Sequence, residues 1–227
     1  PSFPLPKPKG TSLNTLCWNA NAVYHSDLVK RGKKLKELRK FCTSFHVIGL
    51  EEVHGNRAAL REMLGSILKT HLLFHSPFVG DGHTKEDTGG VAFLVSRSLV
   101  FSENLSFAPH FAPNFACIKK MFQILVPGRV ARVVIPFSAQ GNFAYTIVHN
   151  YGLASAQMRV CENSINKDID RAHRTPDLFG FCLLGDFNIE AHDESRFHIS
   201  SPDEGLVVEG LNGDINSSRP LQKRWEK

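Results

Sequence analysis

The sequence predicts an α/β protein built as one large domain. Across the first third of the chain, short apolar runs alternate with longer segments in which apolar residues recur at helical spacing. The resulting order of strand, helix, strand, helix, strand is typical of layered α/β folds. The chain has 227 residues, 42% of them hydrophobic and 22% charged, which is enough for a packed core and ordinary for a globular protein.

The first third contains three predicted strands and two predicted helices. Asp27 offers an N-cap for an amphipathic helix over residues 28–45, whose outer surface is crowded with lysine and arginine. A second amphipathic helix over residues 56–68 starts near Asn56. The strands are the short apolar runs at residues 13–18, 47–50 and 71–75.

After Gly89 the pattern favours strands separated by polar turns. A helix over residues 155–174 and a buried strand at residues 181–184 close the series, and the 39 residues after Asn188 are polar with no predicted strand. The earlier strands of this part are predicted at residues 91–96, 121–126, 130–137 and 142–148, with a hairpin connection at residues 139–142.

Charge and cysteine content narrow the class of protein. The formal net charge of +5 favours polyanionic partners such as nucleic acid or an acidic membrane surface. Five cysteines without a C-x-x-C pair indicate reduced thiols and an intracellular protein. No apolar run approaches the roughly 20 residues that span a bilayer, so no membrane is expected as a partner.

The N-terminal segment differs from the rest in composition. Residues 1–11 are rich in proline and contain neither an initiating Met nor an apolar signal core. We expect these residues to form an extended linker and residues 12–227 to form the domain. This start and the abrupt end of the chain suggest a module of a longer polypeptide.

Polar side chains follow four of the predicted strands, at the point where each strand ends. Rigid strands often fix catalytic groups in this way, and oxygen-rich groups without cysteine suit a hard cation such as Mg²⁺ or Mn²⁺. Such a cation commonly assists phosphate-ester hydrolysis. Taken singly, each residue also has a structural explanation, as a cap, a solvated carboxylate or a core histidine. The residues are Asn19, Asn21, Glu51, Glu52, His149, Asn150, Tyr151, Asp186 and Asn188.

The order of these motifs carries a family resemblance. The series W-N-A-N, L-E-E-V-H, G-G-V-A-F-L-V-S-R, V-H-N-Y and L-L-G-D-F-N, between residues 13 and 188, resembles the endonuclease/exonuclease/phosphatase superfamily. It is most similar to the endonuclease domains of LINE-type retrotransposons. The resemblance implies a DNase I-like, four-layered α/β sandwich of two packed mixed or antiparallel sheets flanked by helices, incomplete at the C-terminus.

The resemblance also implies roles for individual residues. Glu52 would be the principal ligand of Mg²⁺, or of Mn²⁺, with Asn19 beside it. Asp186 and Asn188 would orient the attacking water and the scissile phosphate, and His149 would contact that phosphate as a hydrogen-bond donor or local acid.

Further residues have supporting roles in this interpretation. Asn21 stands where relatives often carry an acid, and Glu51 where they often carry glutamine, so both are secondary candidates. The expected substrate contacts are Asn150, Tyr151, Lys33 and Arg39, the last two on the basic helix.

The resemblance fails at the end of the chain. Family members close with an Asp-containing strand and a Ser-Asp-His sequence, and neither occurs here. His192 and His198 are interpreted as solvated loop residues, and Ser201-Pro202-Asp203 lacks a following histidine. A truncation, a split gene model and a relic completed by another chain all fit, and we expect weak or no activity from this fragment.

Three functions follow from these observations. The first is a DNA-nicking, Mg²⁺-dependent endonuclease joined to a reverse transcriptase and located in the nucleus. The second keeps the fold and the phosphodiesterase chemistry but acts on RNA, lipid head groups or inositol phosphates. The third is a non-catalytic nucleic-acid-binding relic.

Overall fold

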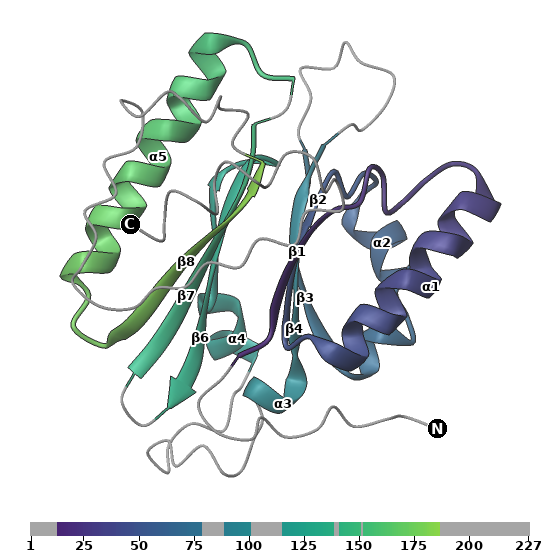
Figure 1. The fold of residues 1–227 in the computed structure, drawn as a ribbon, viewed down its shortest axis with the longest axis horizontal. Coiled ribbons are helices and arrows are strands. Elements are labelled where there is room, and N and C mark those ends of the chain that lie inside the picture. The colour runs from purple at the N-terminus through teal and green to yellow at the C-terminus, as the bar shows by residue number, and fades with distance from the viewer. Residues whose placement is uncertain (1–12, 79–88, 101–114, 139–140, 151, 187–227) are drawn as a thin grey trace, which may run out of the picture.

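Two four-stranded sheets pack face to face between layers of helices. The computed structural model describes residues 13–78, 89–100, 115–138, 141–150 and 152–186. Helix α5 covers the outer face of one sheet, and α1 and α2 cover the outer face of the other (Figure 1). This four-layered arrangement confirms the predicted fold class. The segments interpreted as a linker and as the closing part of the domain lie outside the described residues.

The first sheet has the strand order β1-β2-β4-β3. Its first two strands are parallel, and β4 is antiparallel to both of its neighbours. Consequently β1, β2 and β3 all end at the same edge of the sheet. The strands are β1 (Thr15–Asn19), β2 (Val47–Glu51), β3 (His71–Ser76) and β4 (Val91–Ser96).

The second sheet has the strand order β5-β6-β7-β8. Its first three strands are antiparallel, whereas β7 and β8 are parallel because α5 connects them as a crossover. The strands are β5 (Phe122–Val126), β6 (Val130–Ser138), β7 (Gly141–His149) and β8 (Leu178–Asp186).

The helices follow the predicted pattern with local differences. Helix α1 is capped by the Asp27 carboxylate, which accepts from two backbone amides, as expected. The prediction of one continuous helix over residues 56–68 is wrong, because the helix breaks at Gly65. Glycine is a poor helix former, and the amide of Gly65 donates to the Glu62 carbonyl. The helices are α1 (Leu28–Ser44), α2 (Arg57–Met63), the 3₁₀ turn η1 (Ile67–Lys69), α3 (Arg97–Val100), α4 (Phe115–Lys120) and α5 (Ser155–Arg174).

Alternation along the strands divides the core into three layers. In β2, Ile48 and Leu50 face α1 and α2, whereas Val47 faces the second sheet. Val130 and Val148 of the second sheet pack under α5. Side chains at every second strand position therefore line the space between the sheets.

The structure also bears on the predicted state of the cysteines and on the predicted lack of a membrane-spanning helix. Cys17, Cys42, Cys161 and Cys182 are free thiols. Among the helices of the described ranges, none has both the length and the apolar character needed to cross a membrane.

A buried ion pair joins α5 to its sheet. The Asp168 carboxylate accepts from the Arg132 guanidinium at 2.7 Å and from the Thr146 hydroxyl at 2.6 Å, and both charged side chains are almost fully buried. Because each carboxylate oxygen has a donor, the charge of Asp168 is compensated inside the protein.

Removing one partner of this pair should be far more costly than removing both. Asp168→Ala is expected to lower the free energy of unfolding by about 3–5 kcal/mol, because it leaves Arg132 buried without its counter-ion. The double variant Arg132→Met/Asp168→Leu should recover most of that loss. Urea unfolding measures both values, and a loss for Asp168→Ala under about 1 kcal/mol, the range of an exposed pair, would contradict the assignment.

The buried histidines predict a dependence of stability on pH. Burial lowers the pKa of His71 and His75 from 6.5 to about 4, with the charge of Arg57 adding to the effect at His75. Between those values the unfolded chain binds protons that the folded protein does not. The free energy of unfolding should therefore fall by about 2 kcal/mol per histidine between about pH 7.5 and 5, and level off below the folded pKa.

A single variant separates the two histidines. Both ring nitrogens of His75 are buried, and neither has a hydrogen-bond partner within the described residues. His75→Leu should therefore keep the fold and remove about half of the loss of stability on acidification. Denaturation at several pH values measures it, and an unchanged pH dependence would exclude His75 as a cause.

Candidate active site

The candidate site lies where parallel strands of both sheets end together. Asn19 is in register with Glu51 across β1 and β2, and His149 is in register with Asp186 across β7 and β8. All four side chains occupy the alternating positions that face the other sheet. The packing of the two sheets therefore brings these polar strand ends toward one another.

Glu51 connects the two sheets at this edge. Its Oε2 accepts from the backbone amide of Asp186 at 2.9 Å and lies 3.4 Å from Nδ1 of His149. Its Oε1 accepts from the Cys17 thiol at 3.2 Å, and the residue is 3% exposed. A buried carboxylate is stable only with such donors, so Glu51 fixes the relative position of β2, β7 and β8.

The thiol of Cys17 is held in its neutral form. Burial, followed by the adjacent negative charge of Glu51, raises the pKa of Cys17 well above that of a free thiol. A protonated thiol is a hydrogen-bond donor, which is the role it has toward Glu51. Cys17 is therefore a support for the carboxylate rather than a nucleophile.

The glycine of the G-D-F-N motif is required by close packing. Gly185 has a φ of +123°, and a Cβ built on it would overlap the carbonyl oxygen of Val148. Only glycine fits there. Its backbone conformation therefore determines how β8 continues to Asp186. The amide of Asn150 donates to the Asp186 carbonyl at 2.9 Å, which extends the pairing of β7 and β8 past the site.

Glu52 and Asn19 form a second, more accessible pair. The amide Nδ2 of Asn19 donates to Oε1 of Glu52 at 3.2 Å. Asn19 is exposed and Glu52 half-buried, in contrast to Glu51. A carboxylate and an amide oxygen at an open rim are accessible to a cation and to substrate.

The segments that follow β1 and β2 have a strained backbone. Asn21, Ala22, Glu52 and His54 all have φ between 41° and 64°, in the left-handed region that non-glycine residues rarely adopt. Each such residue costs on the order of 1 kcal/mol and persists only where surrounding contacts hold it. Here the backbone bonds from Ala22 to Glu52 and from His54 to Gly89 supply those contacts.

Two cations lie within the electrostatic field of Glu52. Burial lowers the pKa of Lys34 and of Arg129, and the negative charge of Glu52 opposes that shift in both. The Lys34 ammonium donates to the carbonyls of Ala20 and Asn21. The Arg129 guanidinium lies 4.8 Å from the Phe78 ring centre and donates to the His149 carbonyl at 3.4 Å. The site thus combines carboxylates with fixed positive charge, as a phosphate-binding site requires.

The donor set fits a divalent cation. Ligand atoms of Glu51, His149 and Asp186 lie within 4.8 Å of one another. The carboxylates of this group, with Glu52 and Asn19 at the rim, offer the oxygen ligands that Mg²⁺ and Mn²⁺ prefer, and His149 adds a nitrogen that Mn²⁺ accepts more readily. Glu51 is buried and already accepts from Asp186 and Cys17, so the half-buried carboxylate of Asp186 is the more accessible acid of this group.

The structure brings together only part of the predicted site. Asn150, which follows His149 in the chain, is fully buried, whereas Asn21 is exposed and its backbone amide donates to Asn19. Lys33 and Arg39 are exposed on α1, whose contact with the segment after β1 comes instead from Lys34. The predicted roles of Asn188 and Tyr151 fall on residues outside the described ranges. The residues that the predictions missed or undervalued are Glu51, Cys17, Lys34 and Arg129.

Comparison with known proteins identifies the family. The model of the endonuclease/exonuclease/phosphatase family matches residues 16–223. The chain belongs to the endonuclease/exonuclease/phosphatase family. Members of this family are metal-dependent hydrolases that act on phosphodiester bonds, which agrees with the chemistry of the strand ends. No curated protein matches the chain in sequence.

One solved structure of a family protein shares the fold, and two further structures match with lower TM-scores. A family protein from Bacteroides thetaiotaomicron is 12% identical, with a TM-score of 0.50, over 81% of this chain and 66% of its own. TDP2 from Caenorhabditis elegans is 12% identical, with a TM-score of 0.47, over 84% and 50%. The human nocturnin catalytic domain is 11% identical, with a TM-score of 0.48, over 79% and 66%. The chain thus spans about half to two thirds of the length of these proteins.

Replacement of Glu51 tests its role as the link between the sheets. Glu51→Leu should lower the free energy of unfolding by about 1–3 kcal/mol, because the partly buried amide of Asp186 loses its acceptor. Glu51→Gln keeps one acceptor oxygen and should be much milder. Thermal or urea unfolding compares them, with Glu37→Gln on the surface of α1 as the control. Equal stability of Glu51→Leu and the wild type would mean that this contact does not hold the sheets.

Proposed function

We propose that this protein is a divalent-metal-dependent phosphodiesterase that nicks DNA. The observation that carries the proposal is the meeting of Asn19, Glu51, His149 and Asp186 at one edge of two packed sheets. Fixed carboxylates together with Arg129 and Lys34 suit a site that binds a phosphodiester and a cation at once.

Glu52 and Asn19 would hold the cation in this proposal. When bound, such an ion neutralises the charge that develops on the phosphate during hydrolysis. The hydrogen bond from Asn19 to Glu52 restricts both side chains before any ligand arrives. That restriction lowers the entropic cost of forming the site.

His149 and Asp186 would act on the substrate and on water. A carboxylate near Nδ1 of His149 favours a proton on that nitrogen and holds the ring in one orientation. Asp186, half-buried at the end of β8, would orient the attacking water and accept its proton. Arg129 would offset negative charge on the phosphate beside them.

The biological setting is proposed from the motif series. The order of W-N-A-N, L-E-E-V-H, V-H-N-Y and L-L-G-D-F-N supports a LINE-type retrotransposon endonuclease linked to a reverse transcriptase and acting in the nucleus. The net charge of +5 supports DNA as the substrate.

A plasmid nicking assay tests the proposed function. The protein should convert supercoiled plasmid to open circles in Mg²⁺ or Mn²⁺ and not in EDTA, with the weak activity that its sequence predicts. Asp186→Ala should reduce that rate by about 100-fold or more, as expected for a catalytic proton acceptor. Asp170→Ala, an exposed position on α5, is the matched control and should nick at the wild-type rate.

Three outcomes would contradict this proposal in different ways. Nicking in EDTA would exclude the metal, and nicking by Asp186→Ala at the wild-type rate would exclude that residue. Cleavage of an RNA oligonucleotide without any nicking of plasmid would show that the substrate is RNA and not DNA.

A further inference from the structure

Helix α1 accounts for the net positive charge of the chain. Among the residues of α1, seven are basic and one is acidic, which gives a net charge of +6. The chain as a whole has 27 basic and 22 acidic residues, so the remainder has 20 basic and 21 acidic residues and a net charge of −1. The excess that points to a polyanionic partner is therefore concentrated in α1.

The inner side of α1 is used for packing and for the site. Leu38 and Cys42 are buried against the first sheet. Lys34 donates to the backbone that follows β1, and the Arg31 guanidinium donates to the His25 carbonyl at 2.7 Å and lies 4.1 Å from the Tyr24 ring centre. These contacts seat the first half of α1 beside the segment that begins at Asn19.

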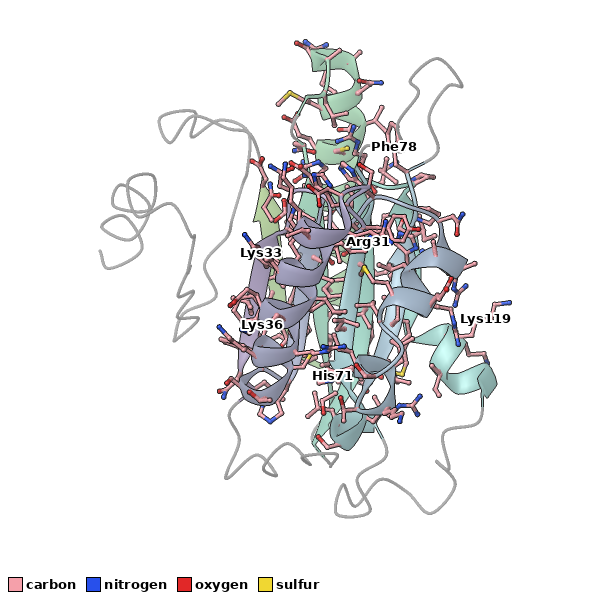
Figure 2. The ribbon with its side chains drawn as sticks, turned by 90° about the vertical axis from the view of Figure 1, so that its right-hand side faces the viewer. Arg31, Lys33, Lys36, His71, Phe78 and Lys119 are labelled. Carbon is pink, nitrogen blue, oxygen red and sulfur yellow. The ribbon has the colours of Figure 1, made fainter. Side chains whose placement is uncertain are left out.

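The outer side of α1 presents a second set of cations. Figure 2 shows Lys33 and Lys36 along one edge of the helix. We call Lys30, Lys33, Lys36 and Arg39 the α1 cation face; all four are exposed. Lys40 pairs with Glu37 at 2.9 Å, whereas no member of the α1 cation face forms an ion pair within the described ranges.

We propose that the α1 cation face binds the backbone of duplex DNA that flanks the candidate active site. The proposal rests on the proposed function, because it assigns the substrate of that site a second contact. Unpaired surface lysines and arginines gain affinity for DNA by releasing the counterions of phosphates, without regard to base sequence. Helix α1 starts beside the segment that follows β1, where Lys34 donates to the Ala20 and Asn21 carbonyls, and runs back along the first sheet (Figure 1). We therefore expect a duplex that extends beyond the site to reach this face.

A membrane surface fits α1 less well than DNA does. A helix that lies in a bilayer interface inserts an apolar face. The apolar face of α1 is instead buried against the first sheet, with Leu38 fully buried. The exposed apolar side chains, Leu28 at 73% and Val29 at 67%, are limited to its first turn. A helix with exposed positive charge and no exposed apolar face is suited to bind a phosphate backbone.

Two variants with the same net charge separate a local surface from a general charge effect. Lys33→Gln/Lys36→Gln/Arg39→Gln removes three cations from α1, and Arg159→Gln/Lys167→Gln/Arg174→Gln removes three exposed cations from α5, on the opposite side of the molecule. Each lowers the net charge from +5 by the same amount. All six side chains are exposed, so both variants should fold, which circular dichroism and urea unfolding verify.

Binding to a labelled duplex oligonucleotide in EDTA, followed by fluorescence anisotropy, measures the contact without cleavage. The α1 variant should bind about tenfold or more weakly than the wild type, and the slope of log affinity against log salt, between about 50 and 200 mM, should decrease by about 3. The α5 variant should match the wild type in both respects.

Three results would overturn the proposal. Equal losses in the two variants would show that only net charge matters, and an unchanged α1 variant would show that the face does not contact DNA. Wild-type binding to phosphatidylserine vesicles that depends on these three residues, without a matching effect on the duplex, would assign the face to a membrane. Cleavage is scored separately, on plasmid. If the wild type fails to nick plasmid but the α1 variant still binds the duplex more weakly than the wild type, the proposed catalysis is rejected and the proposed DNA contact of the α1 cation face stands.

Discussion

Glu51 reaches from the first sheet to the second, and the arrangement of the site depends on that contact. Its carboxylate accepts the amide of Asp186 on β8 and approaches His149 on β7, while Cys17 of β1 donates to its other oxygen. Strands distant in sequence are thereby fixed at their ends by one buried acid. Since such an acid is costly without donors, its contacts allow few other positions of the sheets.

The same constraint explains where the backbone is strained. Four non-glycine residues adopt left-handed conformations directly after β1 and β2, at the rim formed by Asn19 and Glu52. Backbone pairing from Ala22 to Glu52 and the donation of Lys34 to nearby carbonyls hold these loops in place. Local strain is thus offset by contacts made on a rigid sheet edge, an arrangement that preorganises polar groups.

Much of the fold could be predicted from the sequence, and less of the site. Apolar runs and helical spacing identified the strands and the longer helices because those signals are local. The role of Glu51 could not be predicted, since residues 47–50 are apolar or small throughout and give no alternation to show which face Glu51 takes. Its partner Asp186 is 135 positions away, and the pair of Arg132 and Asp168 is similarly hidden. Such contacts exist only after the sheets pack.

The charge of α1 is difficult to explain by stability alone. Lysines at positions 30 and 33, 33 and 36, and 36 and 40 are helical neighbours of like charge, and such pairs destabilise a helix by a few tenths of a kcal/mol each. Lys30 also lies near the positive end of the helix dipole, which Asp27 only partly offsets. Glu37 alone opposes these charges within α1. Like charges that are neighbours on a helix and have no acidic partner are often found where a protein binds a ligand. In α1 the missing partner is negative charge, which the phosphate backbone of DNA would supply.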